Sequence, residues 1–134
     1  MERTYLLSEI DAVAKELLQE SRSKTILFYG EMGAGKTTLI KSILKALGAE
    51  DSGSSPTFSL VNVYETENGT VNHFDFYRIR DESEAWDLGF EEYLDSDAWN
   101  LIEWPEKIRN FIEEEHQKVQ IETLNSGHRK LKFC

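Results

Sequence analysis

Hydrophobic positions along the chain follow helical spacing in some segments and form short continuous runs in others. Apolar residues recur every three or four positions over residues 8–21 and 39–47, which is typical of helices that bury one face. Ser8 is expected to cap the first helix and Gly48 to end the second. Residues 25–29 read Thr-Ile-Leu-Phe-Tyr, a run that predicts a strand buried on both faces.

The second half of the chain predicts short strands separated by turns and helices. Asn68-Gly69 is a strong hairpin signal that joins expected strands at residues 58–64 and 71–79. Residues 81–93 follow helical spacing with a break at Gly89. The remaining expected elements are an edge strand at 3–7, a buried strand at 98–102, a helix from Pro105 to about 114, and a terminal hairpin of 119–124 and 128–133.

Composition and charge narrow the classes of protein that fit. The chain has 134 residues, which suits one domain over residues 1–134 with a strand hairpin at about 115–134. The net charge of −10 repels nucleic-acid phosphates and argues against free-standing binding to DNA or RNA. The single Cys134 builds no disulfide framework, no apolar run approaches the roughly 18 residues of a membrane span, and the N-terminus shows no signal-peptide pattern. A cytoplasmic protein without a membrane partner is expected.

A glycine-rich loop at residues 30–37 carries the most specific chemical signal. It reads Gly-Glu-Met-Gly-Ala-Gly-Lys-Thr and satisfies the pattern G-x-x-x-x-G-K-[ST] between a predicted strand and a predicted helix. Lys36 supplies charge for the β- and γ-phosphates of a nucleotide, and Thr37 supplies a hydroxyl for Mg²⁺. The nucleotide-binding residues expected here are Glu31, Met32, Gly33, Ala34, Gly35, Lys36, Thr37 and Thr38.

This loop and the order of the elements define the expected fold. A strand, a helix and a second strand precede the loop, and helices, hairpins and one more strand follow it. Such an order predicts an α/β fold. With the loop included, we expect a three-layer P-loop NTPase in which a mixed, mostly parallel central sheet has helices on both faces.

Two acidic residues follow strand-like segments and are candidates to complete the site. Asp75 lies in His-Phe-Asp-Phe-Tyr, and Glu103 follows the apolar run at 99–102. A P-loop enzyme needs a carboxylate at the end of a second strand, to hold Mg²⁺ directly or through water. Either residue is suited to this role. Each could equally be an ordinary polar residue at the end of a strand, without a functional role.

Three further residues have two interpretations each. Thr57, after the small polar segment at 50–55, fits a switch residue near the γ-phosphate or a plain turn before a strand. Trp104, beside Glu103, is interpreted either as an aromatic ring that covers the nucleotide or as a tryptophan buried in the core. His73 has no second His or Cys at ligand spacing, which favours a structural histidine over a metal ligand.

Five segments occur together in a specific order along the chain. They are Gly-Glu-Met-Gly-Ala-Gly-Lys-Thr-Thr (30–38), Ser-Pro-Thr-Phe (55–58), His-Phe-Asp-Phe-Tyr-Arg (73–78), Leu-Gly-Phe-Glu-Glu-Tyr (88–93) and Ile-Glu-Trp-Pro-Glu (102–106). This set resembles the TsaE (YjeE) family, the bacterial ATPase component of the machinery that makes threonylcarbamoyladenosine at position 37 of certain tRNAs. The resemblance runs from about Ser8 to Lys107, and the tail beyond is interpreted from its pattern alone.

The resemblance implies a role for each matching residue. Lys36 would bind the phosphates of ATP or ADP. Thr37 and Glu103 would hold Mg²⁺. Asp75 would act at the metal or at the attacking water, and Thr57 would act as a switch residue near the γ-phosphate.

The resemblance also implies partners. The whole chain would act with the TsaB–TsaD complex, in which TsaD carries out the carbamoyl transfer. Within the chain, Trp104 would lie near the nucleotide. Contact with tRNA would be indirect, through that complex, and the ATP cycle would support its turnover.

Two other functions use the same kind of loop. A stand-alone small-molecule kinase needs an acceptor site and a lid that carries arginines. Arg78, Arg80 and Arg109 are the only arginines between the loop and the last ten residues. A nucleotide-gated binding module would bind ATP without hydrolysing it. Measuring ATP turnover with and without partner proteins separates these alternatives from a partner-dependent ATPase.

Overall fold

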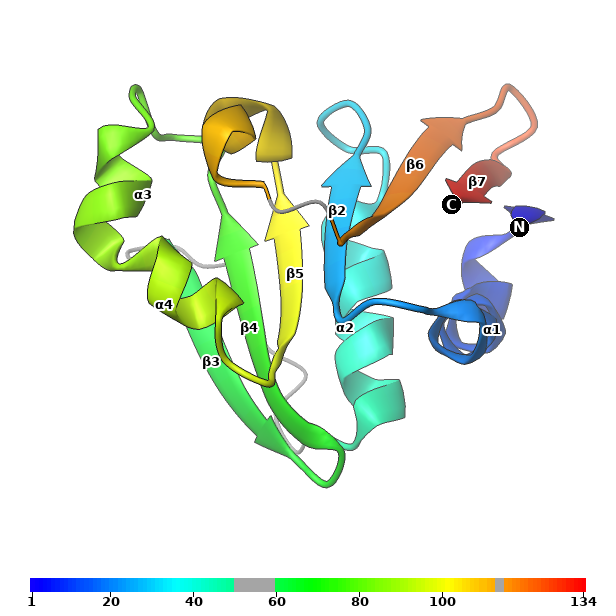
Figure 1. Cartoon of the computed structure of the whole chain (residues 1–134). Helices are drawn as coiled ribbons and strands as arrows, with labels where there is room; N and C mark the ends of the chain where they lie inside the picture. Colours follow the sequence, from blue (N-terminus) through cyan, green and yellow to red (C-terminus); the bar gives the residue numbers. More distant parts are fainter. Residues whose placement is uncertain (50–59, 113–114) are drawn as a thin grey trace.

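A seven-stranded sheet forms the centre of the structure, a computed structural model that describes residues 1–49, 60–112 and 115–134 (Figure 1). The four central strands run parallel to one another, and the three outer strands pair antiparallel. This confirms the predicted mixed, mostly parallel sheet. In spatial order the strands are β1 (Glu2–Tyr5), β7 (Arg129–Phe133), β6 (Gln117–Thr123), β2 (Thr25–Tyr29), β5 (Trp99–Glu103), β4 (Gly69–Asp75) and β3 (Val61–Thr66).

Helices cover both faces of the sheet, as predicted (Figure 1). One core cluster lies beneath α1 (Ile10–Glu20) and α2 (Lys36–Leu47). The other lies beneath α3 (Ser83–Leu88), α4 (Phe90–Leu94) and the 3₁₀ helix η2 (Pro105–Phe111). Within the described residues, no helix is long and apolar enough to cross a membrane.

The apolar run of β2 follows from its position between these two layers. Ile26 and Phe28 belong to the core beneath α1 and α2, whereas Leu27 belongs to the core on the opposite face. All three side chains are fully buried. Because both faces of this strand are covered, successive positions must be apolar, and no polar alternation remains.

Side chains on β4 and β5 alternate between the two faces of the sheet, and this alternation directs the polar residues near the ends of both strands toward α2. Val71 and Leu101 pack in the core beneath α1 and α2. His73 and Asp75 lie two and four positions after Val71. Glu103 lies two positions after Leu101. Because side chains two positions apart on a strand point to the same face, these three polar side chains face the same layer. The strand register pairs Asp75 with Glu103. Since β5 is the parallel neighbour of β2, both carboxylates end up near the loop that follows β2.

The first helix begins differently from the prediction. A 3₁₀ turn, η1 (Leu7–Glu9), comes first, and α1 starts at Ile10, so Ser8 does not cap the helix. The Glu9 side chain instead accepts a hydrogen bond of 2.9 Å from the N–H of Leu6. This N–H lies just before η1 and has no acceptor within the helix, so the Glu9 carboxylate supplies one.

Two other predicted boundaries are wrong. β4 ends at Asp75 because its carboxylate accepts a hydrogen bond of 3.0 Å from the N–H of Tyr77, which turns the chain before the predicted end near residue 79. The segment that starts at Pro105 forms 3₁₀ turns rather than an α-helix. Ile108 leaves the helical region there, with φ of −135°, and its side chain is fully buried against the core beneath α3 and α4.

The glycine positions are confirmed as element ends. Gly48 ends α2 with φ of 95°, and Gly89 separates α3 from α4 with φ of 82°. Both angles lie in the left-handed region, which glycine adopts without steric cost. The strand predicted from residue 58 is seen from Val61 onward, and its first predicted positions lie outside the described residues.

Candidate functional site

The glycine-rich loop connects the end of β2 to the start of α2 through backbone angles that favour glycine. Gly30, Gly33 and Gly35 have φ of 154°, 82° and 104°, which side chains rarely permit. A Cβ atom on Gly30 would lie 2.9 Å from the carbonyl oxygen of Ile121 in β6. The loop therefore needs glycine at its first position for close backbone approach as well as for its angle.

The N-terminus of α2 gives this loop a positive electrostatic character. α2 starts at Lys36, and no side chain caps its first turn. The first N–H groups of a helix have no partner inside the helix, and the helix dipole adds partial positive charge there. A strand, a glycine loop and an uncapped helix start together form an arrangement suited to binding a phosphate group.

Lys36 is a buried cation at the edge of this loop, with 5% of its surface exposed. Its Nζ lies 3.7 Å from the centroid of the Trp104 ring, within the range of a cation–π interaction. Burial lowers the pKa of Lys36, whereas Glu103, Glu106 and Asp75 act to raise it. The carboxylates thus offset part of the cost of burying the ammonium group.

Glu103 is the centre of a buried polar network at the end of β5. Thr37 Oγ1 donates a hydrogen bond of 2.8 Å to Glu103 Oε1, and His73 Nε2 lies 2.6 Å from Glu103 Oε2. The His73 and Glu103 side chains are only 2% and 3% exposed. Each carboxylate oxygen therefore has its own partner, which fixes the orientation of the group. Among the described residues, His73 Nδ1 has no hydrogen-bond partner.

Asp75 and Trp104 lie next to this network. Asp75 is half-buried, opposite Glu103 in the sheet, and its Oδ1 accepts the hydrogen bond from Tyr77. Trp104 has φ of 58° and is the one non-glycine residue with positive φ in the described part of the chain. Such a conformation costs about 1–2 kcal/mol. The Trp104 and Tyr77 rings lie 4.9 Å apart.

A cavity of about 300 Å³ brings most of the predicted residues together. The residues that line it come from the glycine loop, α2, the ends of β4 and β5, and β7: Met32, Gly33, Gly35, Lys36, Thr37, Thr38, Asp75, Tyr77, Glu103, Trp104 and Arg129. None of Arg78, Arg80 and Arg109 is among these lining residues. The arginine-rich lid expected of a kinase is therefore not part of this cavity.

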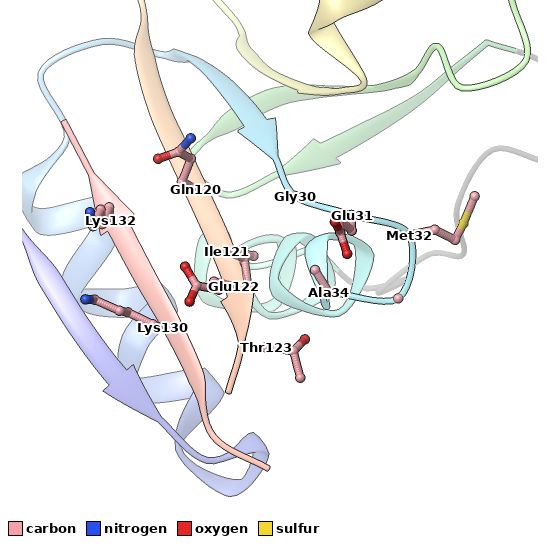
Figure 2. A pocket seen from close by; sticks show the side chains of 11 residues that line it. Gly30, Glu31, Met32, Ala34, Gln120, Ile121, Glu122, Thr123, Lys130 and Lys132 are labelled. Atoms are coloured by element: carbon pink, nitrogen blue, oxygen red, sulfur yellow. The ribbon is translucent and has the colours of Figure 1, made fainter. Parts of the chain in front are cut away.

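Two other predicted nucleotide-binding residues of the glycine loop are not among the residues that line this cavity. Glu31 and Ala34 line a neighbouring cavity of about 500 Å³, between the glycine loop and the C-terminal strands, and their nucleotide-binding role stays a prediction. Figure 2 shows this cavity, with Glu122 projecting from β6 and Lys130 from β7. Thr57 lies outside the described residues, and its role as a switch stays a prediction.

Sequence reasoning missed two residues of the Lys36 cavity, Tyr77 and Arg129. Tyr77 stands two positions after Asp75, so the motif around Asp75 carried a signal for it. Arg129 reaches the loop from β7, where its Nε donates a hydrogen bond of 2.9 Å to the Ala34 carbonyl. No motif marks it, because the contact depends on how distant strands are ordered. His73 is buried in the sheet, where its Nε2 contacts Glu103.

The donor set around Thr37 fits a magnesium ion bound together with a nucleotide. No group of three or more His, Cys, Asp or Glu side chains that could hold a metal occurs in the described residues. Mg²⁺ at nucleotide sites needs no such cage, since one or two carboxylates and the substrate phosphates suffice. The Thr37 hydroxyl and the Glu103 carboxylate, in direct contact at 2.8 Å, are oxygen donors of that kind.

The fold and the site together define a P-loop NTPase-type protein. A parallel strand leads into the glycine loop, Lys36 and Thr37 begin the following helix, and the neighbouring parallel strand ends in a carboxylate that contacts Thr37. A profile of the family described as "Threonylcarbamoyl adenosine biosynthesis protein TsaE" matches residues 6–131. The chain therefore belongs to the TsaE family.

Individual relatives agree with this membership. A tRNA threonylcarbamoyladenosine biosynthesis protein TsaE from Rickettsia felis is 37% identical over 123 residues, which cover 90% of this chain and 71% of the relative. The protein of the same name from Bacillus subtilis is 33% identical over 132 residues, covering 98% and 82%. The crystal structure of Bacillus subtilis YdiB superimposes with a TM-score of 0.75 over 99% of this chain and 83% of that chain. At 24% identity, that superposition supports the fold.

The two loop glycines Gly30 and Gly33 provide a test of the close approach to β6. Gly33→Ala adds a methyl group with nothing within 4 Å, so only backbone strain remains, and we expect a loss of about 1–2 kcal/mol of stability. Gly30→Ala adds a clash with a backbone carbonyl, and we expect a loss of roughly 2–4 kcal/mol. Urea unfolding followed by circular dichroism measures both. Equal losses would contradict the importance of the contact with Ile121.

Proposed function

We propose that this chain binds and hydrolyses ATP with Mg²⁺, and that it acts with the TsaB–TsaD complex in forming threonylcarbamoyladenosine at position 37 of tRNAs. The observation that carries the proposal is the contact of Thr37 with Glu103 next to the buried Lys36, in one cavity at the start of α2. The cavity supports nucleotide binding. Membership of the TsaE family supports the pathway.

In this proposal the loop and α2 hold the triphosphate. Backbone N–H groups at the start of α2 surround the phosphates, and Lys36 binds the β- and γ-phosphates. Burial lowers the pKa of Lys36, and the negative charges of Glu103, Glu106 and Asp75 act to raise it, so these carboxylates favour the charged ammonium form. Because the site combines a helix N-terminus with a buried cation, it attracts phosphate in spite of a net charge of −10.

Thr37 and Glu103 would hold Mg²⁺. When bound with the nucleotide, the ion neutralises charge that develops on the phosphate oxygens during hydrolysis. Glu103 is prepared for this task because His73 and Thr37 each contact one of its oxygens. His73 is therefore a positioning residue, which keeps the carboxylate from rotating away from the phosphates.

Asp75 would orient the attacking water. It lies one strand further from β2 than Glu103, and it lines the same cavity. Its Oδ1 accepts the Tyr77 N–H, which fixes the side chain. In this role Asp75 would accept a proton of the water as the water oxygen bonds to the γ-phosphorus and the bond to the leaving ADP breaks. Thr57 would contact the γ-phosphate as a switch residue, and Trp104 would lie near the nucleotide.

Replacing Lys36 tests nucleotide binding. We expect Lys36→Ala to weaken ATP binding about 10- to 100-fold, because a charge-assisted contact to phosphate is lost. Removal of a buried cation should leave the fold intact by circular dichroism. Lys41→Ala, an exposed lysine on the same helix, serves as the control and should bind ATP as the wild type does. Unchanged ATP binding by Lys36→Ala would argue against a nucleotide site in this loop.

Replacing Glu103 separates hydrolysis from binding. We expect Glu103→Gln to lower Mg²⁺-dependent hydrolysis roughly 100-fold or more, because the amide is a poor metal ligand, while ATP affinity changes far less. Turnover is measured with TsaB–TsaD present, and Glu122→Gln on β6 is the exposed control. If affinity and turnover fall by equal factors, Glu103 acts as a structural residue.

The acidic surface predicts how the chain associates with its partner. Residues 81–97, which contain α3 and α4, include many Asp and Glu and no Lys or Arg. We expect association with TsaB–TsaD to weaken as salt is raised, because exposed charges are screened within about 8–10 Å at physiological ionic strength. Pull-down at low and high salt measures this. Salt-insensitive association would mean that apolar contacts dominate the interface.

A further inference from the structure

A cavity of about 470 Å³ lies between the β3–β4 hairpin and α4, and we call it the α4 cavity. It reaches the starts of β4 and β5, which lie at the end of the sheet opposite the glycine loop (Figure 1). Along β4, Thr70 in this cavity and Asp75 in the Lys36 cavity are about 16 Å apart. The two cavities share no lining residue among those described, so the α4 cavity is separate from the proposed nucleotide site.

The α4 cavity has apolar walls. Val63 of β3 is 51% exposed, and Leu88 and Tyr93 pack partly buried against the core beneath α3 and α4. The Tyr93 ring contacts Phe74 edge-on, with 5.4 Å between the ring centroids. These walls suit the hydrocarbon stem of a side chain, because apolar surface gains free energy when it leaves water.

The charged residues that line the α4 cavity are acidic. They are Glu92 of α4 and Asp97 in the turn before β5, and no Lys, Arg or His of the described residues is among the lining residues. The Asp97 carboxylate lies 3.2 Å from Lys24 Nζ, but its side chain is 97% exposed, so this ion pair contributes little to stability. Apolar walls and carboxylates together fit a side chain with an apolar stem and a cationic head.

A buried amide adds a hydrogen-bond acceptor to the cavity. Asn72 is 3% exposed and lines the cavity, and its Nδ2 donates a hydrogen bond of 3.0 Å to Asn100 Oδ1. Among the described residues this is the only hydrogen bond of the Asn72 side chain, so its Oδ1 remains open to a donor. Acceptor oxygens of Asn72, Glu92 and Asp97 therefore surround one cavity.

The turn that carries Asp97 is held in place by the protein itself. Ser96 Oγ donates a hydrogen bond of 2.6 Å to the Tyr93 carbonyl, and Asn100 Nδ2 in β5 lies 3.4 Å from the same carbonyl. A preformed cavity loses little conformational freedom on binding, which favours association.

The surface around the α4 cavity is strongly acidic. Residues 81–97 contain eight Asp and Glu side chains and no Lys or Arg. A surface of one charge sign attracts a partner surface of the opposite sign and repels one of the same sign. The charge therefore favours a basic protein surface as the source of the cationic side chain.

We propose that the α4 cavity is a docking site for an arginine side chain on a basic surface of a partner protein. A guanidinium is planar, has five N–H donors and stacks on aromatic rings, so it suits the carboxylates, the Asn72 amide and the Tyr93 ring better than an ammonium group does. In the proposed function the partner is the TsaB–TsaD complex, and this part of the inference rests on that function. Because the Lys36 cavity is separate, docking at the α4 cavity does not compete with ATP.

Two pairs of substitutions separate the cavity from the general charge of the surface. Glu92→Gln with Asp97→Asn removes both carboxylates that line the cavity. Glu91→Gln with Asp95→Asn removes two exposed carboxylates of the same segment that do not line it, so the change in net charge is matched. By biolayer interferometry, we expect the first pair to weaken association with TsaB–TsaD roughly 10- to 100-fold and the second less than about threefold. ATP affinity should stay unchanged in both.

A second measurement tests the cavity without TsaB–TsaD. Nα-acetylargininamide is titrated into the isotope-labelled full chain, and the backbone amide shifts are followed by NMR. We expect saturable shifts at Thr70, Ser96 and Ala98, which line the cavity, and weaker binding of Nα-acetyllysinamide. The variant with Glu92→Gln and Asp97→Asn should show none of these shifts, and its spectrum confirms that it is folded.

Four outcomes decide the inference. It is wrong if the two pairs of substitutions weaken association equally, because the surface then acts through its general charge. It is also wrong if the arginine derivative leaves the three amides unshifted, or if the lysine derivative binds as tightly. Self-association of the wild type that Glu92→Gln with Asp97→Asn abolishes would identify a second copy of the chain as the occupant, and would overturn the assignment to another protein. If the wild type does not bind TsaB–TsaD but shows the shifts with the arginine derivative, the arginine site stands and the proposed partner fails.

Discussion

The hydrogen bond between Thr37 and Glu103 joins the two halves of the site. Thr37 lies in the first turn of α2, and Glu103 is the last residue of β5, so the bond can form only if β2 and β5 are parallel neighbours that end at the same edge. Their pairing in turn requires a β2 that is apolar on both faces. His73 reaches the same carboxylate only because β4 follows β5 in the sheet. The geometry of the site is thus a consequence of the strand order.

Local patterns in the sequence were sufficient for the parts of the fold that depend on neighbours along the chain. The apolar run at Thr25–Tyr29, the glycine loop and the helix end at Gly48 were all predicted, because each depends on a few adjacent residues. The failures share another cause. The end of β4 is determined by one side-chain bond between Asp75 and Tyr77, and η2 is kinked where Ile108 is buried, so tertiary contacts override the local pattern there.

The residues of the candidate site also fall into two groups, those that local motifs identify and those whose position depends on the strand order. Lys36, Thr37, Asp75 and Glu103 could be named from motifs, and they line one cavity. The sequence did not reveal which carboxylate contacts Thr37, because both follow strand-like segments, and only the order of β5 and β4 relative to β2 separates them. Arg129 could not be found at all from its surroundings. A residue of the C-terminal hairpin reaches the Lys36 cavity only after β6 has paired with β2.

Trp104 combines an unusual backbone with an unusual neighbour. Its left-handed conformation puts the indole 3.7 Å from the ammonium nitrogen of Lys36, and the Tyr77 ring lies next to it. Indole emission responds to the position of nearby charges, so any ligand that attracts the ammonium group changes the electric field at the ring. The protein consequently contains an intrinsic fluorescent reporter next to the ammonium group that we propose binds phosphate, and occupancy of the cavity can be followed by indole emission without attaching a dye.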